Sequence, residues 1–126
     1  MSSKPVILIA DDSRTIRDHL LFFLRLPEIE LIAVENGKLA IEQIDQHGER
    51  IAMVLSDLHM PEMGGMELVR VLRQEKGFKK PIIILTQEGD NALIKQAKDL
   101  GVNGWMIKPF KGEEVLQIVR RIVKLG

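Results

Sequence analysis

Cysteine is absent from the 126 residues, and Trp105 is the single tryptophan. Without cysteine the chain forms neither a disulfide framework nor a thiolate metal site, and its composition suits a reducing compartment. Neither sign of charge dominates, because 18 basic and 18 acidic residues give a formal net charge of zero. No global field would therefore draw the protein onto nucleic acid or anionic lipid, so the choice of partner depends on local surface.

Long apolar runs are also missing. The first apolar stretch, residues 6–10, is too short for a signal peptide or a membrane span. We therefore expect a cytoplasmic protein with no membrane partner and no direct contact with nucleic acid. With 45% hydrophobic and 29% charged residues, the chain has the balance of one globular domain over residues 1–126. A domain of this size can bury a core without covalent staples.

Short apolar segments rich in β-branched residues alternate with segments of helical periodicity. The former predict strands over residues 6–10, 30–34, 51–56, 81–86 and 103–107. Helices are predicted after each strand, the middle three over about 38–46, 65–76 and 90–100, with Gly101 as a C-terminal stop. Strict alternation predicts a parallel sheet covered by helices on both faces, because right-handed crossovers place each helix on a face. The fold class is therefore a doubly wound α/β domain with five strands and five helices.

Polar residues stand where four of these strands end. They are Asp11 and Asp12 after the first strand, Asp57 after the third, Thr86 at the end of the fourth and Lys108 after the fifth. In open α/β sheets, ligands bind in the crevice beyond the carboxyl ends of the strands. We expect these five side chains to converge at that edge.

The expected cluster is over-supplied with carboxylate. Three carboxylates against one ammonium leave a local charge of about −2, which a divalent cation would neutralise. Mg²⁺ suits the set best, since it prefers oxygen ligands and is usually held by one or two carboxylates together with a phosphate. A carboxylate can then attack phosphorus to give an acyl phosphate, if metal and lysine offset the charge on the phosphoryl oxygens.

Each residue also has an ordinary structural explanation when it is taken alone. An aspartate at a strand end is commonly a turn former or a helix cap, and a surface lysine is commonly just solvated. Thr86 is an unremarkable β-branched strand residue. Capping by Asp11, Asp12 and Ser13 would explain one or two acceptors at the start of the first helix. It does not explain adjacent carboxylates that face a third.

With these residues the chain resembles the receiver domains of two-component response regulators. The resemblance rests on the Asp-Asp pair after the first strand, the segment Ser-Asp-Leu-His-Met-Pro-Glu-Met-Gly-Gly that begins at Ser56, Leu85-Thr86, and Lys108-Pro109-Phe110. It covers essentially the whole chain. It implies the flavodoxin-like strand order 2-1-3-4-5 and a domain that catalyses its own phosphorylation and dephosphorylation, with no turnover of an external substrate.

The same resemblance implies roles for individual residues. Asp57 would accept the phosphoryl group, and Asp11 and Asp12 would hold Mg²⁺ together with Asp57 and the main-chain carbonyl of His59. The ring of His59 would then not be a ligand. Lys108 would contact a phosphoryl oxygen.

Three further features follow from the resemblance. Thr86 would contact a second phosphoryl oxygen, and the Lys108-Pro109 bond would be cis. Trp105 stands where receivers carry a switch aromatic coupled to the hydroxyl of Thr86. A buried packing tryptophan explains Trp105 equally well.

Other chemistries fit the residues less well. A flavodoxin-like FMN site needs a glycine- and hydroxyl-rich loop after the first strand, where Asp11 and Asp12 would repel the phosphate. Phosphatases of the haloacid-dehalogenase type carry a second aspartate two residues after the nucleophile, at the position of His59. Zinc chemistry is set aside because His19, His47 and His59 fall on three different predicted elements.

The expected partners are a sensor histidine kinase or a phosphotransfer protein on one side and a downstream protein target on the other. Residues 101–105 lack the paired acidic residues that winged-helix regulators use for dimer salt bridges, so we expect a monomer like the stand-alone chemotaxis receivers. Two alternatives remain open. The chain could be a receiver-like interaction module that is not phosphorylated, or a receiver excised from a larger regulator.

Overall fold

The computed structural model describes residues 4–124, so the expected domain limits at 1 and 126 lie outside it. Five parallel strands form one sheet in the order β2-β1-β3-β4-β5. The strands are β1 Val6–Ala10, β2 Glu30–Val34, β3 Ile51–Asp57, β4 Ile82–Thr86 and β5 Gly104–Ile107. The helices are α1 Arg14–Phe23, α2 Gly37–His47, α3 Gly65–Gln74, α4 Asn91–Leu100 and α5 Gly112–Val123, with a short 3-10 helix η1 at Gly48–Arg50. The doubly wound fold and the strand order are confirmed.

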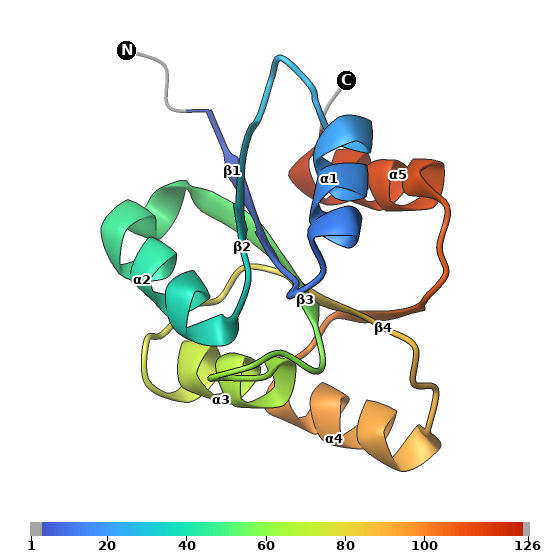
Figure 1. Cartoon of the computed structure of the whole chain (residues 1–126). Helices are drawn as coiled ribbons and strands as arrows, with labels where there is room; N and C mark the ends of the chain where they lie inside the picture. The colour runs from blue at the N-terminus through green and yellow to red at the C-terminus, as the bar shows by residue number, and fades with distance from the viewer. Residues whose placement is uncertain (1–3, 125–126) are drawn as a thin grey trace.

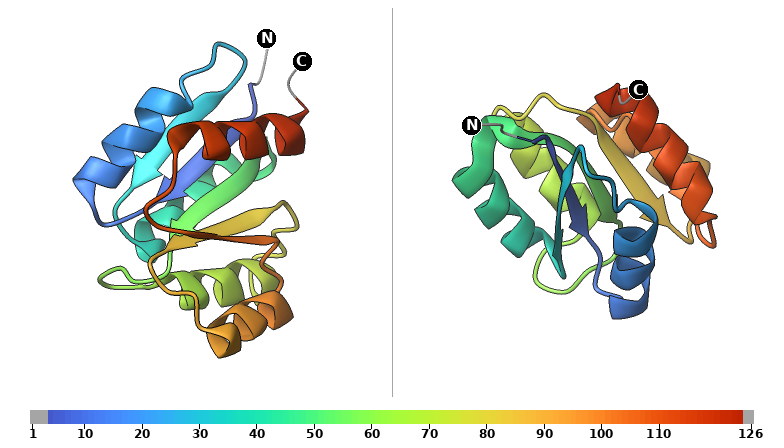
Figure 2. Two further views of the ribbon diagram at one scale, coloured as in Figure 1. Left: turned by 90° about the vertical axis from the view of Figure 1, so that its right-hand side faces the viewer. Right: turned by 90° about the horizontal axis from the view of Figure 1, so that it is seen from above.

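Helices cover both faces of the sheet (Figure 1). Residues of α2, α3 and α4 pack in one core cluster, and residues of α1 and α5 pack in the other. The two further views in Figure 2 show the same three layers. Strand β1, between β2 and β3, is buried along its whole length, as expected for a strand with helices on both sides. Among the described residues, no helix is both long enough and apolar enough to cross a bilayer.

Local sequence signals explain most of the element boundaries. Ser13 caps α1, and its hydroxyl accepts a hydrogen bond from the Ile16 N–H at 3.3 Å. Asp90 caps α4 in the same way, so this helix begins one residue later than predicted. Gly101 ends α4 in the left-handed conformation at φ 107°, which confirms the predicted stop. Helix α3 ends at Gln74, two residues before the predicted end.

Strand boundaries needed small corrections as well. Strand β3 extends one residue further than predicted because Asp57 still pairs with Leu85 in the sheet. Strand β4 starts at Ile82, since Pro81 has no N–H to give to the ladder. The carboxyl ends of β1, β3, β4 and β5 therefore meet at one edge of the sheet.

Candidate functional site

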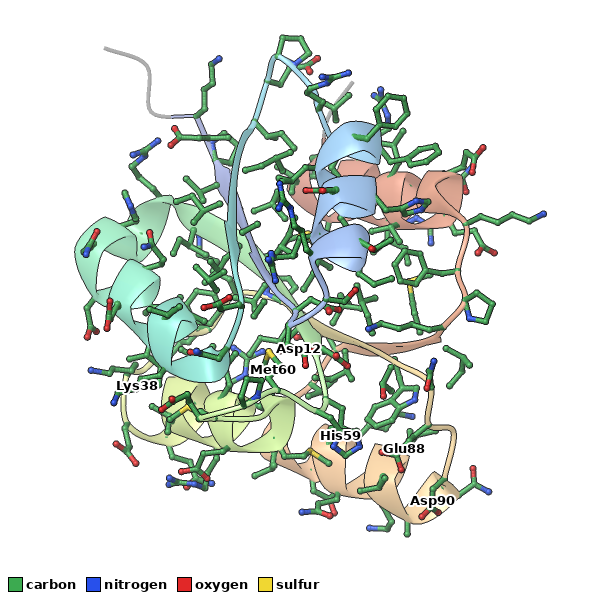
Figure 3. The ribbon with its side chains drawn as sticks, in the orientation of Figure 1. Asp12, Lys38, His59, Met60, Glu88 and Asp90 are labelled. Atoms are coloured by element: carbon green, nitrogen blue, oxygen red, sulfur yellow. The ribbon has the colours of Figure 1, made fainter. Side chains whose placement is uncertain are left out.

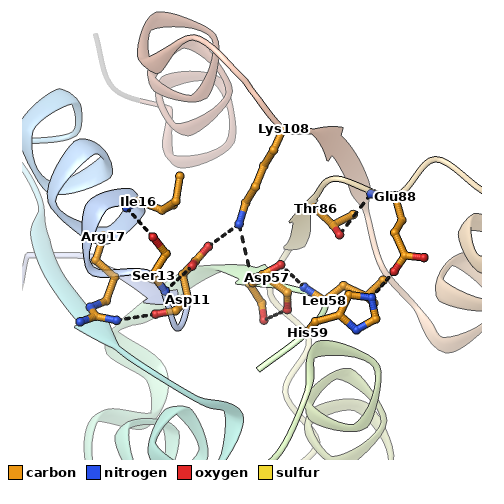
Figure 4. Close-up of polar contacts among 11 residues, drawn as sticks. Asp11, Ser13, Ile16, Arg17, Asp57, Leu58, His59, Thr86, Glu88 and Lys108 are labelled. Atoms are coloured by element: carbon orange, nitrogen blue, oxygen red, sulfur yellow. Dashed lines mark hydrogen bonds and ion pairs between the residues drawn. The ribbon is translucent and has the colours of Figure 1, made fainter. Parts of the chain in front are cut away.

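The predicted polar residues do converge at the carboxyl edge of the sheet, and Figure 4 shows Asp11, Asp57, Thr86 and Lys108 there. Asp12, Asp57, Thr86 and Lys108 line an open cleft of about 850 Å³. Carboxylate oxygens of Asp11, Asp12 and Asp57 all lie within 4.8 Å of one another. This set consists of oxygen donors alone, which fits a hard cation such as Mg²⁺ and does not fit zinc or copper.

The two adjacent aspartates lie in different environments. Asp11 is 1% exposed and its backbone N–H still donates to the Val34 carbonyl, so it sits at the edge of the sheet. The Ser13 N–H donates to Asp11 Oδ1 at 2.9 Å. Asp12 is exposed and faces the cleft. Ser13 is the cap of α1, and Asp11 accepts a hydrogen bond from the backbone of that cap residue, so capping does not by itself account for Asp11. Asp12 is left open to solvent and ligand.

Lys108 links the carboxylates. Its Nζ lies 2.8 Å from Asp11 Oδ2 and 3.4 Å from Asp57 Oδ2. Lys108 directly follows β5, so its ammonium group reaches across the carboxyl ends of the strands. The Lys108-Pro109 bond is cis, as the resemblance implied. One cation thus serves two buried acids, which leaves carboxylate charge in excess.

Asp57 lies at the centre of this excess charge. Burial raises its pKa above the usual range, and the nearby Asp11 carboxylate raises the pKa further. Lys108 and the hydrogen bond from the Leu58 N–H to Asp57 Oδ1, at 2.7 Å, act in the opposite direction but are outweighed. The local environment therefore disfavours the ionised carboxylate until positive charge is added.

Thr86 and Trp105 are connected through Glu88. The Glu88 N–H donates to the Thr86 hydroxyl at 3.4 Å, a long contact, and the Trp105 indole N–H donates to the Glu88 carbonyl at 2.8 Å. Thr86 is buried at 2% exposure, whereas Trp105 is partly buried against the α4 side of the core. Both the switch and the packing explanation for Trp105 are compatible with this geometry.

The ring of His59 is turned toward Glu88 and not toward the three aspartates. Its Nε2 contacts a carboxylate oxygen of Glu88 across the mouth of the cleft, and both residues line it (Figure 3). The ring is therefore engaged with Glu88, and only the main-chain carbonyl of His59 is left as the implied metal ligand.

Sequence reasoning missed two residues that shape the site. Arg17 Nη1 donates to the Asp11 main-chain carbonyl at 2.7 Å and fixes the turn that carries both aspartates. Glu88 bridges His59, Thr86 and Trp105. The sequence shows that Arg17 lies near the start of α1 and that Glu88 follows Thr86 by two residues. No pattern in the sequence indicates which contacts these two side chains make.

The chain is similar to known proteins over most of its length. Residues 7–120 match the response regulator receiver domain. The chain is 36% identical over 118 residues to the chemotaxis protein CheY1 of Helicobacter pylori, covering 90% of this chain and 94% of that protein. It is 33% identical over 122 residues to a CheY homolog of Campylobacter jejuni, covering 95% and 93%.

Among solved structures, the chain superimposes on the chemotaxis protein CheY4 of Vibrio cholerae with a TM-score of 0.84 at 30% identity. The alignment covers 94% of this chain and 98% of the other. The similarity therefore extends over nearly the full length of both chains.

Proposed function

Because the chain belongs to the response regulator receiver family of two-component signalling, we propose that it is a switch phosphorylated on Asp57. The phosphoryl donor would be a histidine kinase or a phosphotransfer protein, and the output would pass to a protein target in the cytoplasm. One observation carries the proposal: Asp57 lies buried beside Asp11, with the Lys108 ammonium between them. Like the chemotaxis receivers that it resembles, the domain would act as a monomer.

The charges define what the site needs. Asp11, Asp12 and Asp57, with the main-chain carbonyl of His59, would hold Mg²⁺. Bound Mg²⁺ would offset negative charge that develops on the phosphoryl oxygens. A carboxylate oxygen of Asp57 attacks phosphorus while the bond from phosphorus to the donor histidine nitrogen breaks. In the structure the Lys108 ammonium contacts two carboxylates, and on phosphorylation it would donate a hydrogen bond to a phosphoryl oxygen as well.

The test is phosphorylation by a small-molecule donor. With acetyl phosphate and Mg²⁺, we expect the intact mass to rise by one acid-labile phosphoryl group, with acetate as the leaving group. Asp57→Asn and excess chelator should each abolish the gain, whereas Glu62→Gln, on the same loop but outside the cleft lining, should not. Incorporation that persists in Asp57→Asn would refute the assignment. A wild-type protein that stays unmodified would favour the non-phosphorylated interaction module.

We further propose that Thr86 and Trp105 transmit the switch. A phosphoryl oxygen on Asp57 would accept a hydrogen bond from the Thr86 hydroxyl, and would do so better in the active conformation than in the inactive one. The hydroxyl would then leave its long contact with the Glu88 N–H, and the loop that holds the indole through the Glu88 carbonyl could move.

Trp105 fluorescence tests this coupling. Starting from the Mg²⁺-bound protein, addition of a phosphoryl mimic should change the emission of wild type, and Thr86→Ala should largely abolish that change. Thr86→Ser, which keeps the hydroxyl, is the matched control and should respond. An identical response in Thr86→Ala would leave Trp105 a packing residue that only reports on its surroundings.

A further inference from the structure

The opposite edge of the sheet carries a second cluster of charge, and its sign is positive. Strands β1, β3 and β4 are neighbours in the sheet, so the segments that lead into them lie side by side at the amino edge. These segments contribute Lys4 before β1, Arg50 before β3, and Lys79 and Lys80 before β4. A chain of zero net charge is therefore acidic at one edge of its sheet and basic at the other.

These residues surround two adjoining hollows. One is a groove of about 520 Å³ whose wall includes Lys76, Lys79 and Lys80. The other is lined by Lys4 and Arg50, and Lys80 borders both. A volume of this size is in the range that holds small ligands. The two hollows together place five cations around one continuous surface.

The ion pairs of the described residues neutralise only two of these five cations, so the two hollows keep a net positive charge. Lys76 is paired with Asp45 at 3.1 Å, and Arg50 is paired with Glu30 at 2.6 Å. In the part of the chain that the structure describes, Lys4, Lys79 and Lys80 make no ion pair, and Glu49 is the single carboxylate in the lining without a cation partner. Three lysines against one glutamate attract an anion.

The backbone adds donors to the same place. Within residues 4–124, the N–H groups of Gly77, Lys79 and Lys80 donate to no protein acceptor. Gly77, in the groove wall, has φ of 65°, with no atom within 4 Å of where a Cβ would stand, whereas the Gly48 N–H already donates to the Ile44 carbonyl. Backbone N–H groups exposed by left-handed turns, together with lysine ammonium groups, are typical of phosphate-binding surfaces.

We infer that this amino-edge groove binds a small ligand carrying two or more adjacent phosphates. Lys79, Lys80 and Lys4 supply the charge, and the free N–H groups of residues 77–80 supply directional hydrogen bonds. Ile44 and Phe78 form the apolar part of the wall and would contact a base, if the ligand is a nucleotide. The site goes beyond the phosphoacceptor function and does not depend on it, because it lies at the other edge of the sheet.

The test is a titration with sodium tripolyphosphate in low salt and EDTA, followed by ¹⁵N-¹H NMR. Without divalent metal, the acidic edge repels the probe. Saturable shifts should concentrate at the amides of residues 76–80 and 48–50. Lys79→Ala/Lys80→Ala should weaken binding about tenfold or more, and Glu49→Gln should strengthen it about threefold. The control Lys95→Ala/Lys98→Ala removes the same charge from exposed positions on α4 and should change nothing.

Three further probes identify the ligand class. ATP that binds more tightly than tripolyphosphate would indicate a nucleotide, and equal affinity would indicate a phosphate chain. Either result supports the groove. Octaglutamate that binds as tightly as tripolyphosphate would overturn the assignment to phosphate. So would unsaturable shifts spread over the surface, or a Lys79→Ala/Lys80→Ala variant that binds like wild type.

Discussion

Two lysine–aspartate pairs, one at each edge of the sheet, have the same chemistry and different surroundings. Lys108 Nζ lies 2.8 Å from Asp11, with side chains 12% and 1% exposed. Lys76 Nζ lies 3.1 Å from Asp45, with side chains 33% and 52% exposed. Removing one partner of a buried pair leaves an uncompensated charge, whereas an exposed pair contributes little. Similar distances therefore hide very different energetic consequences.

The contrast extends to the rest of each edge. At the acidic edge a second carboxylate, that of Asp57, is buried against the pair. Glu62 of the following loop adopts φ of 67°, which is costly for a residue with a Cβ. At the basic edge the unpaired lysines are exposed, and the two residues of the groove wall with positive φ, Gly48 and Gly77, are glycines. Buried like charges and a strained backbone therefore lower the stability of the acidic edge, where the receiver chemistry is proposed. The described residues of the amino-edge groove show neither feature.

Lys108→Ala should have the largest effect. In EDTA we expect a loss of about 3 kcal/mol of unfolding free energy, because Asp11 would be buried without a cation. Saturating Mg²⁺ should restore most of it. Affinity for Mg²⁺, followed by Trp105 fluorescence, should be unchanged or tighter, since a competing cation is gone. Urea denaturation with and without Mg²⁺ measures both effects.

The matched control is Lys108→Met, which keeps the aliphatic stem but removes the charge. It should lose nearly as much stability in EDTA as Lys108→Ala. If Lys108→Met is as stable as wild type, the loss in Lys108→Ala comes from packing. Weaker Mg²⁺ binding in either variant would count against the proposed role of Lys108.

Asp57→Asn should stabilise the metal-free protein. Because the folded state raises the pKa of Asp57 above its unfolded value, the folded state binds the proton more tightly. Stability therefore falls as pH rises from about 4, the unfolded pKa, through the folded pKa, and the full cost is present above both. We expect Asp57→Asn to be more stable than wild type at pH 7 in EDTA, by less than Lys108→Ala loses.

The gain in Asp57→Asn should vanish below about pH 4, where wild-type Asp57 is protonated in both states. Urea denaturation of both proteins at each pH isolates the difference from all other titrating groups. Mg²⁺ should also remove the advantage at pH 7 by stabilising wild type. A gain that is the same at both pH values would show that charge at Asp57 is not its cause.

Glu62→Gly probes the backbone at the acidic edge. Glycine adopts φ near 67° without the Cβ clash, but it loses more backbone entropy on folding. We expect stability to be unchanged or raised by at most about 0.5 kcal/mol. The same substitution at Glu42, exposed inside α2, should cost about 1 kcal/mol. Equal losses at both positions would contradict a penalty at Glu62. Thermal unfolding in Mg²⁺ provides the comparison.

Most of the fold was predictable because its signals are local. Apolar segments of four to seven residues, helical stripes such as Leu68, Val69 and Leu72, and caps such as Gly101 each act over a few residues. The errors were of one or two residues at element ends, where a proline or a capping side chain decides the boundary. Periodicity does not contain the strand order, which came from the family resemblance.

The composition of the site was predictable and its internal asymmetry was not. Parallel strands bring their carboxyl ends to one edge, so Asp57, Thr86 and Lys108 had to converge. The turn after β1 decides that Asp11 is buried and Asp12 is exposed. Arg17 fixes this turn through a hydrogen bond from its side chain to the main-chain carbonyl of Asp11, six residues earlier, which no sequence pattern predicts. The contact of His59 with Glu88 depends on two loops that no local pattern brings together.

The smallest effect should come from Lys76→Ala at the basic edge. This substitution also removes a lysine from an aspartate, but both partners are solvated, and exposed pairs contribute about 0.2 to 1 kcal/mol. We expect a loss of at most about 0.5 kcal/mol in EDTA. Mg²⁺ should not reverse it, since Asp45 lines the amino-edge groove and does not belong to the cluster of three aspartates at the acidic edge. Salt should reduce even this loss, because exposed charges are screened. Urea denaturation at two ionic strengths, run beside Lys108→Ala, gives the direct comparison. A loss near that of Lys108→Ala would mean that burial does not separate the two pairs, and the contrast between the two edges would fail.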